Sequence, residues 1–203
     1  MEAVSVITGT AAPLPGANID TDQIVPHRFL KRVARSGFGE VLFFDWAHDA
    51  DGNPTPEFVL NRPERQGVSV LVAGPNFGSG SSREHAAWAV QDFGFRAVIA
   101  ESFADIFRGN CHKVGVVPVV LTGAEVTDLM NRVTDDPALE VTVDLPAQTV
   151  TAGTFRASFD IDPFVKQAFI EGLDDIDRTL EREVTIAAHE RVRPGYLPSI
   201  PAT

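Results

Sequence analysis

The clearest pattern in the chain is a series of three short, nearly continuous apolar runs separated by segments of helical spacing. The runs are Val68–Ala73, Arg96–Glu101 and Val116–Leu121. Apolar runs of this length are typical of strands buried on both faces of a sheet. Between them, Arg83–Phe93 and Ser102–Asn110 place apolar residues at helical spacing. This order predicts an α/β fold with a parallel β-α-β-α-β core and right-handed crossovers. Pro118 in the third run indicates an edge strand or a strand end.

Weaker patterns precede this core. A faint apolar alternation predicts a strand at Val4–Thr8, and two prolines predict a loop at Ala11–Ala17. Ile19–Pro26 is rich in Asp and Thr and is expected to be irregular. A short helix is expected from Arg28 to Ala34.

Residues 36–66 combine several aromatic residues with a turn-like Asp51-Gly52-Asn53-Pro54 sequence. This pattern predicts a long ordered excursion with room for one short strand. Long excursions from a compact domain often have a function.

The remainder of the chain is expected to add a small antiparallel layer and a helical extension. The predicted helices are Ala124–Arg132, Asp162–Gly172 and Asp174–His189, and the predicted short antiparallel strands are Glu140–Leu145, Thr149–Ala152 and Phe155–Phe159. The tail from Arg193 onward is rich in proline and is expected to be loose. A length of 203 residues suits one domain with extensions, so we treat 1–203 as a single domain.

Composition narrows the functional classes. The net charge of −11 argues against a broad nucleic-acid-binding surface, although it leaves room for a small anionic substrate bound by local cations. Cys111 is the only cysteine, so this chain alone cannot form a disulfide framework or a four-cysteine metal site. No apolar run is long enough to span a membrane, and no secretory signal is evident. We therefore expect a cytoplasmic protein that binds no membrane.

One basic segment stands out from the acidic background. From His27 to Arg35 the sequence has Arg28, Lys31, Arg32 and Arg35 and no acidic residue. It is either a solvated helical face or a segment that meets an anionic ligand or an acidic partner surface.

The segment with the clearest chemistry is the glycine-rich loop Asn76–His85, which joins a predicted buried strand to a helix. Ligands of open α/β sheets bind at this position, beyond the carboxyl end of a strand. Gly78 and Gly80 permit tight turns, and a helix N-terminus favours anions. Arg83 adds a planar fork suited to a carboxylate. The loop therefore predicts a site for a carboxylate or a phosphate.

A purely structural interpretation of the loop is the alternative. Ser81 and Glu84 have the spacing of a capping box, so Ser81 could simply cap the helix while the glycines turn the chain. Two adjacent hydroxyls and an arginine at one helix start exceed what capping requires. The loop lacks the Gly-Lys-Ser/Thr ending of a P-loop and the Gly-x-Ser-x-Gly pentapeptide of a hydrolase nucleophile elbow.

These residues also resemble a known family. NFGSGSSREHAAWAV followed by FRAVIAESFADIFRGN is similar to the swivelling-domain segment of the aconitase superfamily. With NIDTDQIVPHRFLKR, SGFGEVLFFDW and GLDDIDRTL, the resemblance covers essentially the whole chain. It points to the bacterial small subunits of 3-isopropylmalate dehydratase, enzymes of leucine biosynthesis.

The resemblance implies a swivelling β/β/α domain that works with a large subunit. That subunit would hold a [4Fe-4S] cluster through three cysteines, and this chain would bind no metal. The reaction would dehydrate 2-isopropylmalate to 2-isopropylmaleate and rehydrate it to 3-isopropylmalate, a small dicarboxylate. By motif position, Ser81 would be the catalytic base, Ser82 and Arg83 would bind a substrate carboxylate, and Asp22 would match an active-site aspartate.

Further residues are expected to have supporting roles around the active site. Gly80 and Ser79 belong to the substrate-binding loop, and Thr21 and Glu84 lie next to the matching positions. His85 is expected to have an indirect or capping role, and Arg28 and Lys31 to reach the substrate or the partner. Another three residues, Phe38, Phe43 and Trp46, are expected to shape an isopropyl pocket or to fill the subunit interface. Cys111 is expected to be a small buried apolar residue.

Two alternatives stay open. One is the small subunit of a related isomerase acting on citramalate-type or homocitrate-type acids. The other is a non-catalytic anion-binding module. Such a module needs Arg83 but no serine base, so the presence of Ser81 argues against it.

Overall fold

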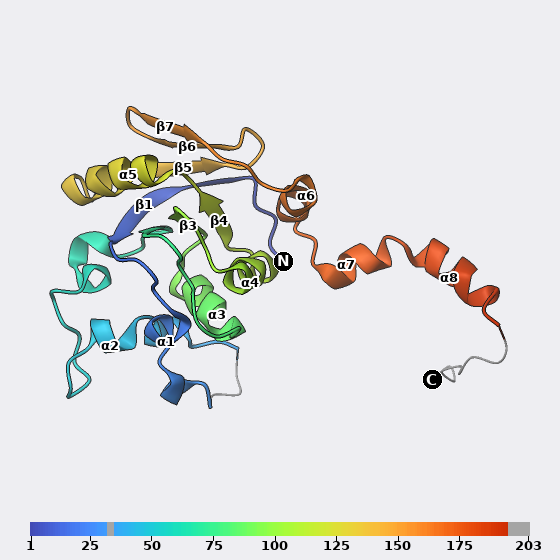
Figure 1. Cartoon of the computed structure of the whole chain (residues 1–203), viewed down its shortest axis with the longest axis horizontal. Coiled ribbons are helices and arrows are strands. Elements are labelled where there is room, and N and C mark those ends of the chain that lie inside the picture. The colour runs from blue at the N-terminus through green and yellow to red at the C-terminus, as the bar shows by residue number, and fades with distance from the viewer. Residues whose placement is uncertain (32–34, 195–203) are drawn as a thin grey trace.

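A seven-stranded sheet with the order β4-β3-β2-β1-β5-β6-β7 forms the centre of the computed structural model, which describes residues 1–31 and 35–194 (Figure 1). Its strands are β1 (Val6–Leu14), β2 (Val70–Ala73), β3 (Ala97–Ala100), β4 (Val117–Val120), β5 (Glu140–Asp144), β6 (Thr149–Ala152) and β7 (Phe155–Ser158). Strands β1 to β4 are parallel, and β5 to β7 continue the sheet in antiparallel pairs.

Helices cover both faces of this sheet. The α-helices are α1 (Thr21–Ile24), α2 (Phe44–Ala47), α3 (Glu84–Phe93), α4 (Asp105–Val114), α5 (Gly123–Asp135), α6 (Pro163–Glu171), α7 (Asp175–Leu180) and α8 (Glu183–Arg191). Short 3-10 turns are His27–Phe29, Gly39–Val41, Val59–Asn61 and Pro63–Arg65.

The core is divided by the sheet into two layers. In β2 the side chains alternate, so that Leu71 and Ala73 pack beneath α3 and α4 while Val70 and Val72 face the layer that contains α5. All four residues of this strand are buried, as they are in β3. The predicted parallel α/β core is therefore confirmed, and so is the antiparallel layer of β5 to β7. Pro118 lies in β4, which is an edge strand, as its position predicts.

The first strand is longer than predicted. We expected a loop at Ala11–Ala17, but β1 continues through Pro13 to Leu14 and pairs with β2 over this stretch. Successive residues of a strand point their N–H and C=O groups to opposite sides. The Thr10 carbonyl accepts from the Ser69 N–H and therefore faces β2. Three residues later, the backbone nitrogen of Pro13 faces the opposite side, where β5 pairs with β1 only as far as Thr10. The missing N–H of proline therefore removes no ladder bond.

The segment after β1 also differs from expectation. Ile19–Pro26, predicted to be irregular, contains α1, whose N-cap Asp20 forms a capping box with Gln23. In the described part of the expected helix Arg28–Ala34, the structure has the 3-10 turn His27–Phe29 followed by turn residues at 30–31; residues 32–34 lie outside the described residues.

The long excursion at residues 36–66 is ordered, as predicted, but it contains no strand within residues 35–66. It consists of α2 and three 3-10 turns, with one isolated bridge between His48 and Pro54. Phe38 and Phe43 are fully buried in the core beneath α3, and Trp46 stacks on Phe43. Phe38 and Phe43 have no exposed surface, so the expected role in filling the subunit interface is wrong for these two residues. The expected role in shaping an isopropyl pocket stays a prediction.

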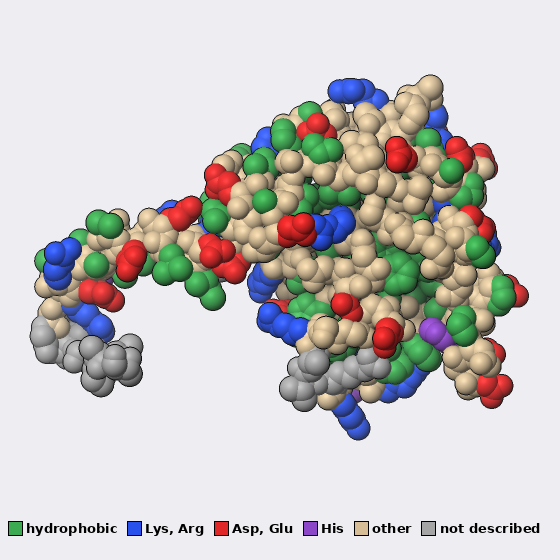
Figure 2. All heavy atoms as spheres, turned by 180° about the vertical axis from the view of Figure 1, so that it is seen from behind, with side chains coloured by type: hydrophobic (Ala, Val, Ile, Leu, Met, Phe, Trp, Pro, Cys, Tyr) green, Lys and Arg blue, Asp and Glu red, His purple; other side chains and the backbone are tan. Residues whose placement is uncertain are grey.

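The predicted single helix Asp174–His189 is two helices. The Arg182 N–H bonds to the Thr179 carbonyl at 3.0 Å, which tightens the last turn and ends α7. Helices α7 and α8 form an arm that leaves the body of the molecule (Figure 1). No residue of α8 is buried, and apolar side chains lie at the surface of the arm (Figure 2). Most of the expected loose tail, 195–203, lies outside the described residues.

Candidate active site

The glycine-rich loop follows the carboxyl end of β2 and leads into α3, where the sequence places it. On one side it is fastened to the segment before α1. The Gly78 N–H donates to the Ile19 carbonyl at 2.8 Å, the Thr21 N–H donates to the Ser79 carbonyl at 2.8 Å, and the Ser79 hydroxyl donates to the Asn18 carbonyl at 3.2 Å. These hydrogen bonds join the loop to residues about sixty positions earlier in the chain.

The other side of the loop is fastened to the segment between β3 and α4. The Phe77 N–H donates to the Ser102 carbonyl at 3.0 Å, and the Ala104 N–H donates to the Phe77 carbonyl at 3.0 Å. The buried Phe77 ring meets the Phe107 ring edge-on at 5.3 Å. The loop therefore has a fixed backbone on both flanks.

Gly78 is required at its position for two reasons. Its φ is +77°, a conformation that side chains rarely adopt, and a β-carbon there would lie 2.2 Å from the Phe107 ring. The loop can pass over α4 only because this residue has no side chain.

The expected capping box of Ser81 and Glu84 is wrong. Helix α3 begins at Glu84 with Arg83 as its N-cap, and no side chain caps it. The reason is a tight turn, in which the Arg83 N–H donates to the Ser81 carbonyl at 2.9 Å and holds Ser81 outside the helix. Glu84 instead approaches Lys113 of α4 at 3.6 Å. Within the described residues, therefore, no side chain caps the first N–H groups of α3, and such groups are suited to binding an anion.

Ser81 and Ser82 are both exposed at this helix start. The Ser81 N–H donates to Thr21 Oγ1 at 3.2 Å, and the hydroxyl oxygens of these two residues lie 3.5 Å apart. Within the described part of the chain, the Ser82 hydroxyl has no protein partner. Both hydroxyls can therefore meet a ligand from outside.

Arg83 is already paired. Its Nη1 and Nη2 donate to the two carboxylate oxygens of Asp22 at 2.6 and 3.0 Å. Its side chain is only 21% exposed, whereas that of Asp22 is 53% exposed. This bidentate pair fixes the guanidinium plane against Asp22 and leaves its remaining N–H groups for a ligand.

His85 faces the core and does not cap the helix. Its ring lies 4.6 Å from the Trp88 ring and 5.2 Å from the Phe38 ring, measured between centroids. Burial, followed by the charge of Arg83, lowers the pKa of His85, so the ring is neutral at pH 7. Its buried Nδ1 has no hydrogen-bond partner in the described residues.

Arg28 is engaged away from the loop. Its guanidinium pairs with both carboxylate oxygens of Asp45, with Nη1–Oδ2 at 3.2 Å, and lies over the Phe29 ring. The hydrogen bond with Asp45 raises the pKa of Arg28. Lys31 is exposed. The structure thus brings Thr21, Asp22 and the loop together.

Comparison with known proteins supports the same interpretation. A family model described as Aconitase C-terminal domain matches residues 1–124, and a second, described as LeuD_N, matches residues 127–163. A 3-isopropylmalate dehydratase small subunit from Rubrobacter xylanophilus is 52% identical over 98% of this chain and 100% of its own length. The chain belongs to the 3-isopropylmalate dehydratase small-subunit family.

Other members of this family agree. The small subunit from Streptomyces griseus is 52% identical over 98% of both chains, and that from Chloroflexus aurantiacus is 51% identical over 96% of this chain and 97% of its own. The crystal structure of 3-isopropylmalate dehydratase (leuD) from Methanocaldococcus jannaschii is 26% identical and covers 90% of this chain and 98% of its own, with a TM-score of 0.62. The family name implies a large-subunit partner.

This small subunit has no site for a metal cluster within its described residues. No three His, Cys, Asp or Glu side chains come together there. Cys111 is fully buried, and burial raises the pKa of its thiol far above the usual range. No helix of residues 1–31 and 35–194 has the length and apolar character needed to cross a membrane.

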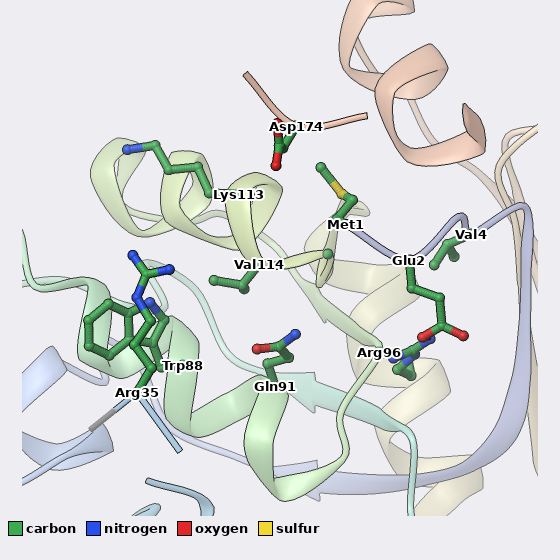
Figure 3. Close-up of a pocket in the computed structure, with 11 residues that line it drawn as sticks. Met1, Glu2, Val4, Arg35, Trp88, Gln91, Arg96, Lys113, Val114 and Asp174 are labelled. Carbon is green, nitrogen blue, oxygen red and sulfur yellow. The ribbon is translucent and has the colours of Figure 1, made fainter. Parts of the chain in front are cut away.

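A hollow on another part of this small subunit is not lined by any residue of the loop. A cavity of about 280 Å³ lies between the N-terminal segment, α3 and α4 (Figure 3). Two arginines that line it contact neighbouring side chains: Arg96 forms an ion pair with Glu2, and the Arg35 guanidinium lies over the Trp88 ring at 5.0 Å from its centroid.

The residues that anchor the loop and α1 were not predicted from the sequence. Asn18 and Asp20 do not appear among the expected site residues, yet Asn18 anchors Ser79 and Asn76, and Asp20 caps α1. The Asp-x-x-Gln spacing at Asp20 and Gln23 is the signal that could have predicted α1.

Proposed function

We propose that this chain supplies one half of the 3-isopropylmalate dehydratase active site to its large subunit. Together they would interconvert 2-isopropylmalate and 3-isopropylmalate through 2-isopropylmaleate in leucine biosynthesis. The observation that supports this most directly is the exposed pair Ser81 and Ser82 at an uncapped helix start, followed in the chain by Arg83, whose guanidinium is held by Asp22. Because these proposed catalytic residues are exposed in this chain, the surface of a partner subunit would be needed to exclude water from them.

Ser81 is the proposed base. It would remove the proton from the carbon beside a substrate carboxylate, and during rehydration it would return that proton. Serine is a weak base at neutral pH, so the charged oxygen needs nearby donors. The open N–H groups at the start of α3 and the guanidinium of Arg83 are suitable donors.

Ser82 and Arg83 are the proposed carboxylate ligands. The Ser82 hydroxyl and the N–H groups of Arg83 that do not face Asp22 can meet one carboxylate. Gly80 and Ser79 shape the loop on which these groups stand, and Asp22 orients the guanidinium. Glu84, His85 and Arg28 have contacts elsewhere in the chain, and Lys31 is exposed, so we assign all four residues supporting roles only.

The proposal includes a [4Fe-4S] cluster held by the large subunit. The cluster would supply an open iron that binds the substrate hydroxyl as a Lewis acid. The described residues of this chain do not fit cluster ligands, and its only cysteine is buried. We further propose that residues 1–203 act as one swivelling domain in the cytoplasm.

The test is reconstitution. The chain and a cognate iron–sulfur large subunit would be assayed separately and mixed, under anaerobic conditions, by the ultraviolet absorbance of 2-isopropylmaleate. We expect hydration only in the mixture. Hydration by this chain alone would contradict the half-site proposal.

A second substrate tests specificity. If the mixture turns over citraconate but not 2-isopropylmaleate, the chain is the small subunit of a related isomerase. If the mixture turns over no such acid although the cluster is intact, the loop belongs to a non-catalytic anion-binding module.

A further inference from the structure

Thr21 is a buried hydroxyl residue directly beneath the loop. It is 2% exposed, although the neighbouring Asp22 and Gln23 are exposed. Its backbone is pinned at both ends, because its N–H donates to the Ser79 carbonyl at 2.8 Å and its carbonyl accepts from the Val25 N–H at 3.0 Å. A buried β-branched side chain on a fixed backbone has few accessible rotamers, and the contacts of Oγ1 with Ser81 select one of them. The position of Oγ1 is therefore fixed by the fold.

Among the described residues, the polar contacts of this hydroxyl are all with Ser81. Oγ1 accepts from the Ser81 N–H at 3.2 Å, lies 3.3 Å from the Ser81 carbonyl oxygen and lies 3.5 Å from Ser81 Oγ. A threonine hydroxyl has one proton to donate and two lone pairs. Because the N–H contact uses a lone pair, the single proton can go either to the carbonyl oxygen or to the hydroxyl oxygen of Ser81.

The loop is built to allow this approach. A β-carbon on Gly80 would lie 3.4 Å from Thr21 Oγ1 and 3.3 Å from the Asp20 β-carbon. Gly80 also has a φ of +91°, so a side chain there would be strained. The bare backbone of Gly80 leaves room for the buried hydroxyl next to Ser81.

We infer that Thr21 is a positioning residue for Ser81, which holds its backbone in the resting site and donates a hydrogen bond to its side-chain oxygen when that oxygen becomes charged. At rest the proton is shared between two weak neutral acceptors. A charged oxygen is a much stronger acceptor and forms shorter bonds, so the Thr21 proton turns to it. Ser81 is exposed and can rotate to shorten the 3.5 Å contact. This inference rests on the proposed role of Ser81 as the base.

The test compares variants of this chain in the reconstituted two-subunit enzyme, assayed by hydration of 2-isopropylmaleate. Thr21→Val keeps the branched shape and removes the hydroxyl, and Thr21→Ser keeps the hydroxyl and removes the methyl group. We expect Thr21→Val to lower kcat about tenfold to a hundredfold with KM nearly unchanged, since a bond to a charged group is lost. Thr21→Ser should restore most of kcat. Thr21→Ala is a second hydroxyl-free variant, and thermal unfolding and assembly with the large subunit are measured for each.

The outcomes separate the possibilities. A kcat within about twofold of wild type in a folded, assembled Thr21→Val or Thr21→Ala enzyme overturns the inference. So does a Thr21→Ser enzyme that loses as much kcat as Thr21→Val, because the methyl group would then be the important feature. Ser81→Ala is assayed in parallel. If it remains active, the proposed base is wrong; if it is inactive while Thr21→Val is normal, only this inference is wrong.

Discussion

At the scale of single residues, the site depends on pairing that exists before any substrate arrives. Asp22 holds the fork of Arg83 with two bonds, and Thr21 holds the backbone of Ser81. The residue types at Ser81, Ser82 and Arg83 indicate anion chemistry from the sequence alone. Their partners could not be predicted in this way, because contacts across about sixty positions depend on how β1 and β2 bring their following segments together.

We expect Arg83→Lys to lower kcat/KM about a hundredfold, because a lysine ammonium cannot bond both carboxylate oxygens of Asp22 and still present donors in a fixed plane. The measurement is steady-state hydration of 2-isopropylmaleate by the reconstituted enzyme. Arg62→Lys is the matched control, since Arg62 is exposed and donates to the Glu57 carbonyl. Equal kcat/KM in the two variants would show that the planar fork is not needed.

His112 gives the molecule a predictable pH dependence of stability. Its ring packs edge-on against Phe169 at 5.8 Å, and burial, followed by the charge of Arg108, lowers its pKa to about 4, while Asp162 acts in the opposite direction. The unfolded chain, with a His pKa of about 6.5, takes up the proton first. The free energy of unfolding should therefore fall as pH drops from about 6.5 to about 4.

A fully buried ring with this pKa shift would change the free energy of unfolding by about 3 kcal/mol. The His112 ring is partly reached by solvent, so we expect roughly half of that change. The measurement is urea unfolding at several pH values for wild type and for His112→Gln. The variant should lose this part of the pH dependence, whereas His27→Gln, at an exposed position, should keep it. Parallel pH profiles for wild type and His112→Gln would contradict the assignment.

At the scale of elements, the sequence was most informative where burial alone determines structure. The apolar runs of β2, β3 and β4 and the spacing of α3 gave the parallel core. Errors came where long-range pairing overrode local signals. Pro13 suggested a loop, yet it lies in β1 on the side that needs no N–H, and Ser81 suggested a cap, yet a tight turn keeps it outside α3.

The loop between β2 and α3 should be intolerant of side chains at Gly78. Gly78→Ala combines a positive φ with a contact of 2.2 Å to Phe107, so we expect it to lower the free energy of unfolding by about 3 kcal/mol or more. Gly52→Ala is the matched control, because its φ is +85° but no atom lies within 4 Å. It should cost only about 1 kcal/mol. Urea unfolding of both variants measures the two free energies of unfolding. Equal losses in the two variants would mean that Phe107 moves to make room and would contradict the expectation.

At the scale of the whole molecule, the sheet positions the glycine-rich loop so that Ser81 and Ser82 are exposed. The arm of α7 and α8 extends away from the body (Figures 1 and 2). The fold class and the family could be predicted from the sequence, because motifs along the entire chain agree with one another. The break between α7 and α8 could not, since no residue of α8 is buried and only local spacing was available.

The most direct test of the central claim is the kcat of Ser81→Ala in the assembled two-subunit enzyme. If Ser81 is the base that this chain contributes, kcat should fall by about a thousandfold or more while KM changes little, because the loss affects proton removal rather than binding. Ser5→Ala, at an exposed serine beside β5, should keep wild-type activity. A Ser81→Ala enzyme that retains more than about a tenth of wild-type kcat would contradict the claim, because losing a positioned proton-transfer group should cost far more.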